Sequence, residues 1–297
     1  MDKILPPLLK NNATIGFLSV AGDICNPNLV IKVKQDFEAL GYNVKISETI
    51  NTNQNYLCAD DDKRAEALNC FFADKEIDAI IAVRGGYGSI RILDKIDYEL
   101  VKNNPKIFCG YSDITALQLM MYKKTGLVTY NAPMILSDFA SDISAYTSSS
   151  FWYVLKNELN EITVDNPKIY YEGIASGIFW GGNLSTIQSM CGLNFIPDEK
   201  FVFFAEDINE PVYKIDRMFS QLLNVSKFRE NIVAIVLGEF SHIDNDVYFD
   251  GFFQGLANDL KIPIVSGLSF GHCKDKQTFP IGVDVLLDTH CCKILIT

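Results

Sequence analysis

The order of elements in the first half of the chain constrains the fold most. Apolar segments of strand length alternate with segments of helical spacing, and the expected strands cover residues 14–20, 43–47, 78–83 and 106–109. After the first strand a helix is expected from Asn26, a favoured cap, with Pro27 at its first position and Gly41 placed to end it. A repeated strand–helix order is typical of a parallel sheet with helices on both faces. This half is therefore predicted to be an α/β domain.

The second half of the chain has a more mixed pattern that is richer in strands. Its expected strands cover residues 201–205, 232–237, 262–266 and parts of 283–296, and its clearest expected helices cover 212–223 and 249–260. Ser, Asp, Asn and Tyr become frequent between residues 137 and 173, and we interpret 160–173 as the crossing between domains. We predict one domain at residues 1–165 and a smaller, β-rich α+β domain at residues 174–297.

Composition excludes several classes of protein. The 297 residues are 48% hydrophobic and 21% charged, which is typical of a globular chain with a substantial core. The net charge of −11 argues against a nucleic-acid partner, which would favour a basic patch. No apolar run approaches the roughly 20 residues that span a bilayer, so no membrane partner is expected. The start of the chain carries a Pro6-Pro7 pair that interrupts any signal-peptide core, so we expect a cytoplasmic protein.

The cysteines do not predict a disulfide framework or a metal site. Eight cysteines occur, none in a Cys-x-x-Cys pair, and several lie within apolar segments, which is typical of reduced cytosolic proteins. His290, Cys291 and Cys292 are adjacent, but neighbouring residues of a strand point to opposite faces and do not easily share an ion. We therefore expect no metal and no cofactor.

A serine stands where an apolar strand meets a helix. Residues 106–109 read as the end of a buried strand, and from Asp113 the apolar residues recur at helical spacing. Ser112, on the turn between them, can present its hydroxyl beside the unpaired N–H groups of the first helical turn, as a serine nucleophile requires. The alternative is that Ser112 only caps the helix, a common role for serine. The motif lacks the second glycine of G-x-S-x-G, because Ile114 stands there.

A histidine and a carboxylate supply partners for such a serine. His272 lies just past an apolar strand and follows Gly271, a position where open α/β sheets hold ligands. Glu206 ends the apolar run 201–205, where a partly desolvated carboxylate needs a partner. Asp207 follows it, and either carboxylate could orient the histidine while the other binds backbone or Arg217. Ser112, Glu206 and His272 then give a nucleophile, an orienting acid and a general base.

The loop 84–89 is rich in glycine and follows an expected strand. It matches neither common nucleotide-binding fingerprint, so its phosphate signal is weak. Its backbone N–H groups could instead hold an oxyanion, with Gly86 and Asp113 as candidate donors. Arg84 could bind a substrate carboxylate as a bidentate fork, or it could only brace the loop.

These segments together resemble the LD-carboxypeptidase and microcin C immunity family of serine peptidases. The matching motifs follow the family's order: residues 83–88, 110–113, 181–184, 205–207 with Tyr213 and 216–217, and 271–272. The resemblance implies a catalytic triad at Ser112, Glu206 and His272. It also implies a Rossmann-like first domain, similar to glutamine amidotransferases, which carries the nucleophile, and a second domain with the acid and base, the site lying between them. Family members are commonly homodimers. Residues 131–134 and Gly192-Leu193 depart from the usual motifs near the expected pocket wall.

The resemblance implies one of two activities. We favour release of terminal D-alanine from murein tetrapeptides, as in peptidoglycan recycling, because no long insertion is evident after Gly173. The alternative is cleavage of peptidyl-nucleotides of the microcin C type, which gives self-immunity. Two rival interpretations stay open: a cysteine nucleophile at Cys109 or Cys273, and a muropeptide-binding protein without catalysis. The sequence leaves open whether diaminopimelate or lysine occupies the third peptide position.

Overall fold

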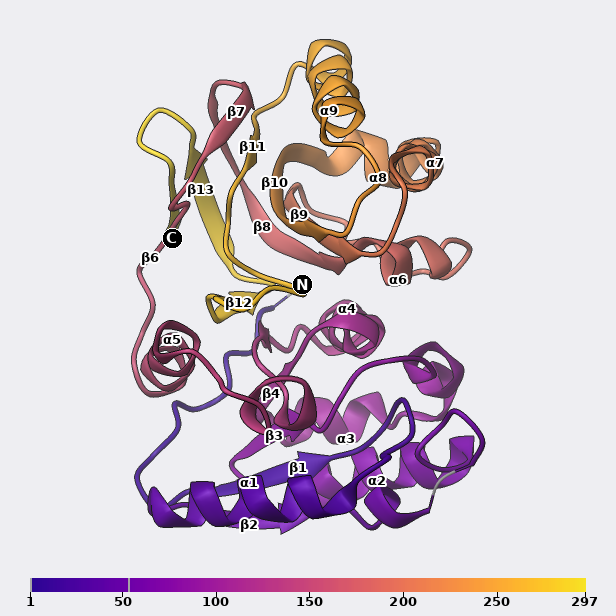
Figure 1. Cartoon of the computed structure of the whole chain (residues 1–297), viewed down its shortest axis with the longest axis vertical. Coiled ribbons are helices and arrows are strands. Elements are labelled where there is room, and N and C mark those ends of the chain that lie inside the picture. The colour runs from indigo at the N-terminus through magenta and orange to yellow at the C-terminus, as the bar shows by residue number, and fades with distance from the viewer. Residues whose placement is uncertain (1, 53) are drawn as a thin grey trace. The chain divides into compact units, whose positions relative to one another are not determined.

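The chain falls into two compact units, and each is described by itself. A computed structural model describes residues 2–52 and 54–297 (Figure 1). The first unit runs up to Glu158, and the second begins at Leu159.

The first unit is built on a parallel sheet, as the strand–helix order predicts. Within this unit the strand order is β5-β4-β3-β1-β2, and all four neighbouring pairs are parallel. The strands are β1 (Thr14–Leu18), β2 (Asn43–Ile46), β3 (Ala79–Ala82), β4 (Ile107–Gly110) and β5 (Thr129–Asn131). The connecting helices are α1 (Pro27–Ala39), α2 (Asp61–Ala73), α3 (Tyr98–Asn103), α4 (Thr115–Thr125) and α5 (Ala145–Lys156). The expected Rossmann-like α/β fold is confirmed.

The first helix of this unit begins where the sequence places its cap. Asn26 caps α1 by accepting a hydrogen bond from the backbone of Asn28, and Pro27 is its first residue. Asp60 caps α2 in the same way through the backbone of Lys63. Figure 1 shows α1 lying across β1 and β2, with Val30, Val33 and Phe37 on its buried face. These helices hold the sheet so that the loops after β1, β3 and β4 leave its carboxyl edge together.

The second unit contains a larger, mixed sheet. Its strand order is β6-β14-β13-β8-β9-β10-β11-β7, in which β8, β9, β10 and β11 run parallel and the flanking pairs are antiparallel. The strands of this sheet are β6 (Glu161–Thr163), β7 (Lys168–Tyr171), β8 (Ile174–Asn183), β9 (Phe201–Ile208), β10 (Ile232–Ser241), β11 (Ile264–Ser266), β13 (Asp284–Asp288) and β14 (Lys293–Ile296). The short strand β12 (Phe279–Ile281) lies outside this sheet. The helices are α6 (Leu184–Ser189), α7 (Val212–Leu223), α8 (Ser226–Asn231) and α9 (Asp246–Leu260).

Aromatic packing fills the core of this second unit. Trp180 of β8 is fully buried, and its ring centroid lies 5.0 Å from Phe201 and 5.7 Å from Phe195. Large rings bury much apolar area, and such pairs contribute roughly 0.5–1.5 kcal/mol beyond it. Figure 1 shows α7, α8 and α9 gathered beside β9 and β10. The core therefore fixes β8 and β9, whose carboxyl ends carry the polar residues described below.

The interpretation of residues 160–173 as a crossing is wrong. Residues 161–163 and 168–171 form β6 and β7, the two edge strands of the second sheet. Their polar composition misled the sequence analysis, because edge strands face solvent and carry polar residues more often than central strands. The structural division falls earlier, between Glu158 and Leu159.

None of the helices in residues 2–52 and 54–297 is both long enough and apolar enough to cross a bilayer.

Candidate active site

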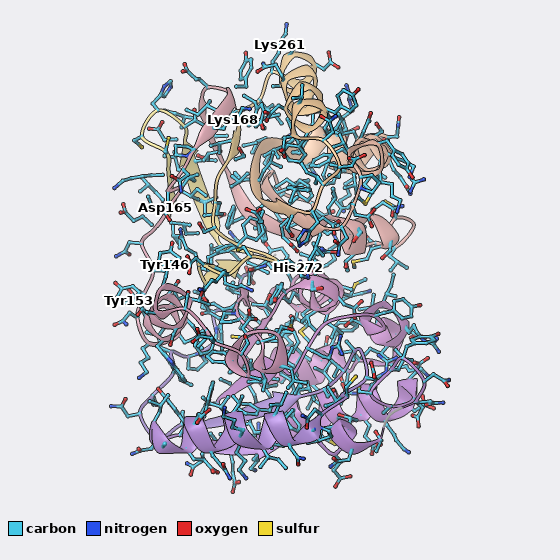
Figure 2. The ribbon with its side chains drawn as sticks, viewed as in Figure 1. Tyr146, Tyr153, Asp165, Lys168, Lys261 and His272 are labelled. Atoms are coloured by element: carbon cyan, nitrogen blue, oxygen red, sulfur yellow. The ribbon has the colours of Figure 1, made fainter. Side chains whose placement is uncertain are left out.

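Glu206 and His272 form a hydrogen-bonded pair within the second unit. His272, labelled in Figure 2, lies on the loop between β11 and β12, and its Nδ1 is 2.8 Å from Oε2 of Glu206. The backbone N–H of His272 donates to the same oxygen at 3.2 Å. The Glu206 side chain is fully buried, whereas that of His272 is 21% exposed. A carboxylate at Nδ1 holds the proton there, so Nε2 is the ring nitrogen that can accept one.

Gly271 allows this close approach. Its φ is +94°, a conformation that side chains rarely adopt. A Cβ at this position would lie 2.4 Å from Oε2 of Glu206, well inside any normal contact distance. The glycine before the histidine is therefore required by the pair itself.

Asn183 holds the other oxygen of Glu206. Its Nδ2 donates to Oε1 of Glu206 at 3.1 Å, and its Oδ1 accepts the backbone N–H of Thr186, which caps α6. The pairing of β8 with β9 places Asn183 directly opposite Glu206. This pairing needs a glycine at position 181, since a Cβ there would lie 1.8 Å from the carbonyl oxygen of Phe204. This role of Asn183 was not predicted from the sequence. The available signal was an asparagine that stands between a pair of glycines and the apolar start of a helix, a favoured cap position.

Asp207 binds backbone N–H groups, which is one of the roles that the sequence left open for the carboxylate that does not orient the histidine. It accepts the backbone N–H groups of Ser185 at 2.7 Å and Ile208 at 2.9 Å, together with Nδ2 of Asn183 at 3.1 Å. Its side chain is buried, and burial, followed by the nearby charge of Glu206, raises the pKa of Asp207 to about 6. Glu206, rather than Asp207, therefore orients the histidine, and Asp207 anchors the start of α6.

The raised pKa of Asp207 makes folding stability depend on pH. Its usual pKa is 3.8, so the folded state binds the proton more tightly than the unfolded chain does. This stabilisation is present at low pH and is lost as the pH rises from about 4 to about 6. Relative to Asp207→Asn, the free energy of unfolding of the wild type should fall by up to about 3 kcal/mol over that range. Urea denaturation of both proteins at pH 4 and pH 7 measures the difference, and parallel pH profiles would contradict it.

Ser112 occupies a strained turn in the first unit. It follows β4, begins the short 3₁₀ turn Ser112–Ile114 and has φ +61°, which is uncommon for a residue other than glycine. No side-chain hydrogen bond caps that turn or α4. The interpretation of Ser112 as a helix cap is therefore wrong. Strained backbone of this kind is concentrated at functional sites, where the surrounding structure maintains it.

Gly85 lies against the hydroxyl of Ser112. A Cβ built on Gly85 would lie 3.1 Å from Oγ of Ser112 and 3.3 Å from the backbone nitrogen of Asp113. The serine oxygen and a candidate oxyanion donor therefore border the same small space, which the glycine leaves open. The carboxyl group of Asp113 is buried and accepts the backbone N–H of Ser89 at 2.9 Å. Burial raises its pKa.

Gly86 and Arg84 belong to the same loop. Gly86 has φ +105°, a conformation suited to glycine, and the structure leaves its role as an oxyanion donor a prediction. Arg84 donates from Nη1 to the backbone oxygen of Asp23 at 2.9 Å, and the same nitrogen lies 3.8 Å from the Asp23 carboxylate. Arg84 therefore braces the loop, which is one of the two roles considered for it. Binding of a substrate carboxylate by Arg84 stays a prediction.

A side chain at position 85 should impair catalysis more than folding. Gly85→Ala would place a methyl group between Oγ of Ser112 and the backbone N–H of Asp113, and we expect kcat to fall about 10²-fold, as for a lost oxyanion donor. The backbone at Gly85 needs no positive φ, so the melting temperature should change little. Gly251→Ala on α9 is the matched control, because nothing lies within 4 Å of a Cβ there. Equal activity of the two variants would show that the space beside Ser112 is not used.

His290 lies in the exposed turn between β13 and β14. Cys109 is fully buried, and burial raises the pKa of its thiol. Throughout the described residues, no three or more His, Cys, Asp or Glu side chains are grouped as metal ligands.

Comparison with known proteins identifies the family. The model of the LD-carboxypeptidase N-terminal domain matches residues 15–132, and that of the LD-carboxypeptidase C-terminal domain matches residues 176–287. A probable murein peptide carboxypeptidase of Bacillus subtilis is 30% identical, over 96% of this chain and 91% of the relative. The microcin C7 self-immunity protein MccF of Escherichia coli is 26% identical, over 93% of this chain and 90% of the relative.

A solved structure agrees with the sequence comparisons. The crystal structure of muramoyltetrapeptide carboxypeptidase from Oxalobacter formigenes is 29% identical and superposes with a TM-score of 0.84, covering 95% of this chain and 97% of that one. Both halves of the chain match the family's two domains, and the similarity extends over nearly the whole length. The chain belongs to the LD-carboxypeptidase family of peptidases.

Proposed function

We propose that the protein is a serine-type LD-carboxypeptidase that releases terminal D-alanine from murein tetrapeptides. The observation that carries this proposal is the Glu206–His272 pair, with Nδ1 2.8 Å from a fully buried carboxylate oxygen. A buried carboxylate bonded to Nδ1 is the arrangement that prepares a histidine to act as a general base. The strained turn at Ser112, with no cap to explain it, supplies a candidate nucleophile.

The proposed reaction is acyl transfer to Ser112. Oγ of Ser112 attacks the carbonyl carbon of the L,D-amide while Nε2 of His272 takes the hydroxyl proton. Backbone N–H groups, with Gly86 and Asp113 as candidates, stabilise the oxyanion. The C–N bond then breaks and His272 gives the proton to the departing D-alanine. Water, activated by the same histidine, releases the tripeptide and restores the serine. This mechanism requires the two units to bring Ser112 to His272.

The names of the relatives support a murein peptide as substrate. Relatives named for murein peptide and muramoyltetrapeptide carboxypeptidases match this chain at 30% and 29% identity. The second candidate substrate is a peptidyl-nucleotide, supported by the 26% identity to the microcin C7 self-immunity protein. We favour the murein peptide because β8 begins at Ile174, directly after Gly173, and leaves no room for a long insertion there.

Product analysis by mass spectrometry tests the proposal. The wild-type protein is incubated with L-Ala-D-Glu-diaminopimelate-D-Ala tetrapeptide, with its lysine counterpart, and with an aspartyl-adenylate analogue. We expect free D-alanine from at least one tetrapeptide and slower or no release of nucleotide. Release of nucleotide without D-alanine would assign the second candidate substrate. Stable binding of tetrapeptide without any product would overturn the enzyme proposal in favour of a binding protein.

A further inference from the structure

Two tyrosines are exposed together beside the glycine-rich loop of the first unit. Tyr56 is 59% exposed and Tyr87 is 47% exposed, and their ring centroids are 5.9 Å apart at an angle of 50°. Aromatic side chains usually bury most of their area, so two rings left open to solvent beside each other provide a surface for a ligand. We call Tyr56 and Tyr87 the tyrosine pair.

Main-chain hydrogen bonds fix the tyrosine pair relative to the candidate nucleophile. The backbone N–H of Asp23 donates to the carbonyl of Tyr56 at 3.1 Å, and that of Gly22 donates to the carbonyl of Gly85 at 3.1 Å. Gly85 in turn lies against Oγ of Ser112. The hairpin 54–57, the loop after β1 and the glycine-rich loop therefore form one connected structure at the carboxyl edge of the sheet.

Arg64 locks the far end of the glycine-rich loop. Its guanidinium is fully buried and donates to the carbonyl of Gly88 at 2.9 Å and to that of Val20. Gly88 has φ +123°, and a Cβ there would lie 2.6 Å from a methyl carbon of Leu57. Tyr87 is thus held between two glycines of positive φ on a braced loop, and its position is set before any ligand binds. A preorganised aromatic surface binds more tightly, because less freedom is lost on binding.

A polar cavity adjoins the tyrosine pair. Its volume is about 340 Å³, and Tyr56 and Leu57 form its apolar wall. Asp61 and Arg91 line it as a paired group, with Nη2 of Arg91 2.8 Å from the Asp61 carboxylate. Lys95 and Asp62 line it as a second ion pair at 2.8 Å. An aromatic wall with a few hydrogen-bonding groups around it fits a ring that has an apolar face and polar substituents.

The tyrosine pair lies within the span of the proposed substrate. Tyr87 is two residues from Gly85, so their Cα atoms are at most about 7.6 Å apart. Three peptide residues precede the scissile bond of a murein tetrapeptide and span up to about 10 Å. In a muramoyl tetrapeptide the next group is the amino sugar.

We propose that the tyrosine pair and the adjoining cavity form a subsite for the N-acetylmuramoyl sugar of a muramoyl peptide. One face of the sugar ring packs on Tyr56 and Tyr87, and the polar groups of the cavity face its substituents. This inference rests on the proposed function and extends it from the peptide to the sugar.

The test compares kcat/KM for a murein tetrapeptide with and without an N-acetylmuramoyl group. We expect the wild type to favour the sugar-bearing substrate by about tenfold, which corresponds to about 1.4 kcal/mol of additional binding free energy. Tyr56→Leu and Tyr87→Leu should each bring this ratio towards one, whereas Tyr56→Phe should preserve it. Tyr153→Leu is the matched control, since Tyr153 is 56% exposed. It lies on α5, where Figure 2 labels it. An unchanged ratio in the Tyr56 and Tyr87 variants would overturn the sugar subsite.

A binding measurement separates this inference from the proposed function. Calorimetry in a Ser112→Ala background compares muramyl dipeptide with the same dipeptide lacking the sugar, and needs no turnover. Weaker binding of muramyl dipeptide after Tyr56→Leu supports the subsite even if the wild type releases no D-alanine. Equal binding of both ligands overturns the subsite even if D-alanine is released. If Tyr56→Leu abolishes binding of adenosine monophosphate but leaves muramyl dipeptide binding unchanged, the tyrosine pair binds a nucleobase. That result would also overturn the sugar subsite.

Discussion

Ser112→Ala should lower kcat for D-alanine release by roughly 10³–10⁶-fold, because the variant has no oxygen to form the acyl-enzyme. The fold should be retained, since the hydroxyl caps neither the 3₁₀ turn nor α4. Substrate affinity should change little, because the lost interaction exists only along the reaction path. Initial rates of D-alanine release, together with the thermal unfolding curve of each protein, provide the measurement.

Cys109→Ala, which removes a thiol three residues before Ser112, is the control for Ser112→Ala. Cys109 is fully buried in β4, and burial raises the pKa of its thiol, which disfavours the reactive thiolate. Cys109→Ala should therefore retain most of the activity. Near-normal turnover by Ser112→Ala would exclude Ser112 as the nucleophile, and complete loss of activity in a folded Cys109→Ala variant would favour the thiol.

Glu206→Gln should lower kcat by about 10⁴-fold while leaving the fold intact. The carboxylate accepts both N–H groups of His272, at 2.8 Å from Nδ1 and 3.2 Å from the backbone nitrogen. A glutamine amide directed at Nδ1 can present its own N–H groups, which favours the tautomer with the proton on Nε2, and that nitrogen can then no longer act as a base. Steady-state kinetics at pH 7–8 and thermal unfolding of the same samples measure both effects.

Glu230→Gln supplies the matched control for this substitution. Glu230 is an exposed glutamate on α8, so its amide variant makes the same chemical change at the surface. We expect wild-type rates from it. A Glu206→Gln variant within tenfold of the wild type would mean that another group orients the histidine.

The sequence predicted the elements of this fold well where the local pattern was strong. The helix expected at residues 212–223 is α7 (Val212–Leu223), and the predicted cap at Asn26 starts α1. Apolar spacing and capping chemistry act within a few residues, so a single segment contains the information. Edge strands β6 and β7 escaped detection because their hydrogen-bonding partners lie far along the chain.

The candidate site was predictable in its residues but not in its geometry. Glu206 and Asp207 could not be told apart by alternation, because the choice depends on the register of β8 against β9 and on Gly271. The part that Asn183 plays follows from the same register. The strain at Ser112 is likewise invisible in the sequence, because serine is common in ordinary caps and only the backbone angle distinguishes the two cases.

The hydrogen bonds that join the hairpin 54–57 to the loop after β1 run from main chain to main chain. Evolution or an engineer can therefore exchange side chains on this hairpin without dismantling its attachment, whereas residues 181 and 271 tolerate almost nothing beyond hydrogen at Cα. Libraries intended to change ligand preference at the tyrosine pair should diversify the hairpin and spare those two glycines.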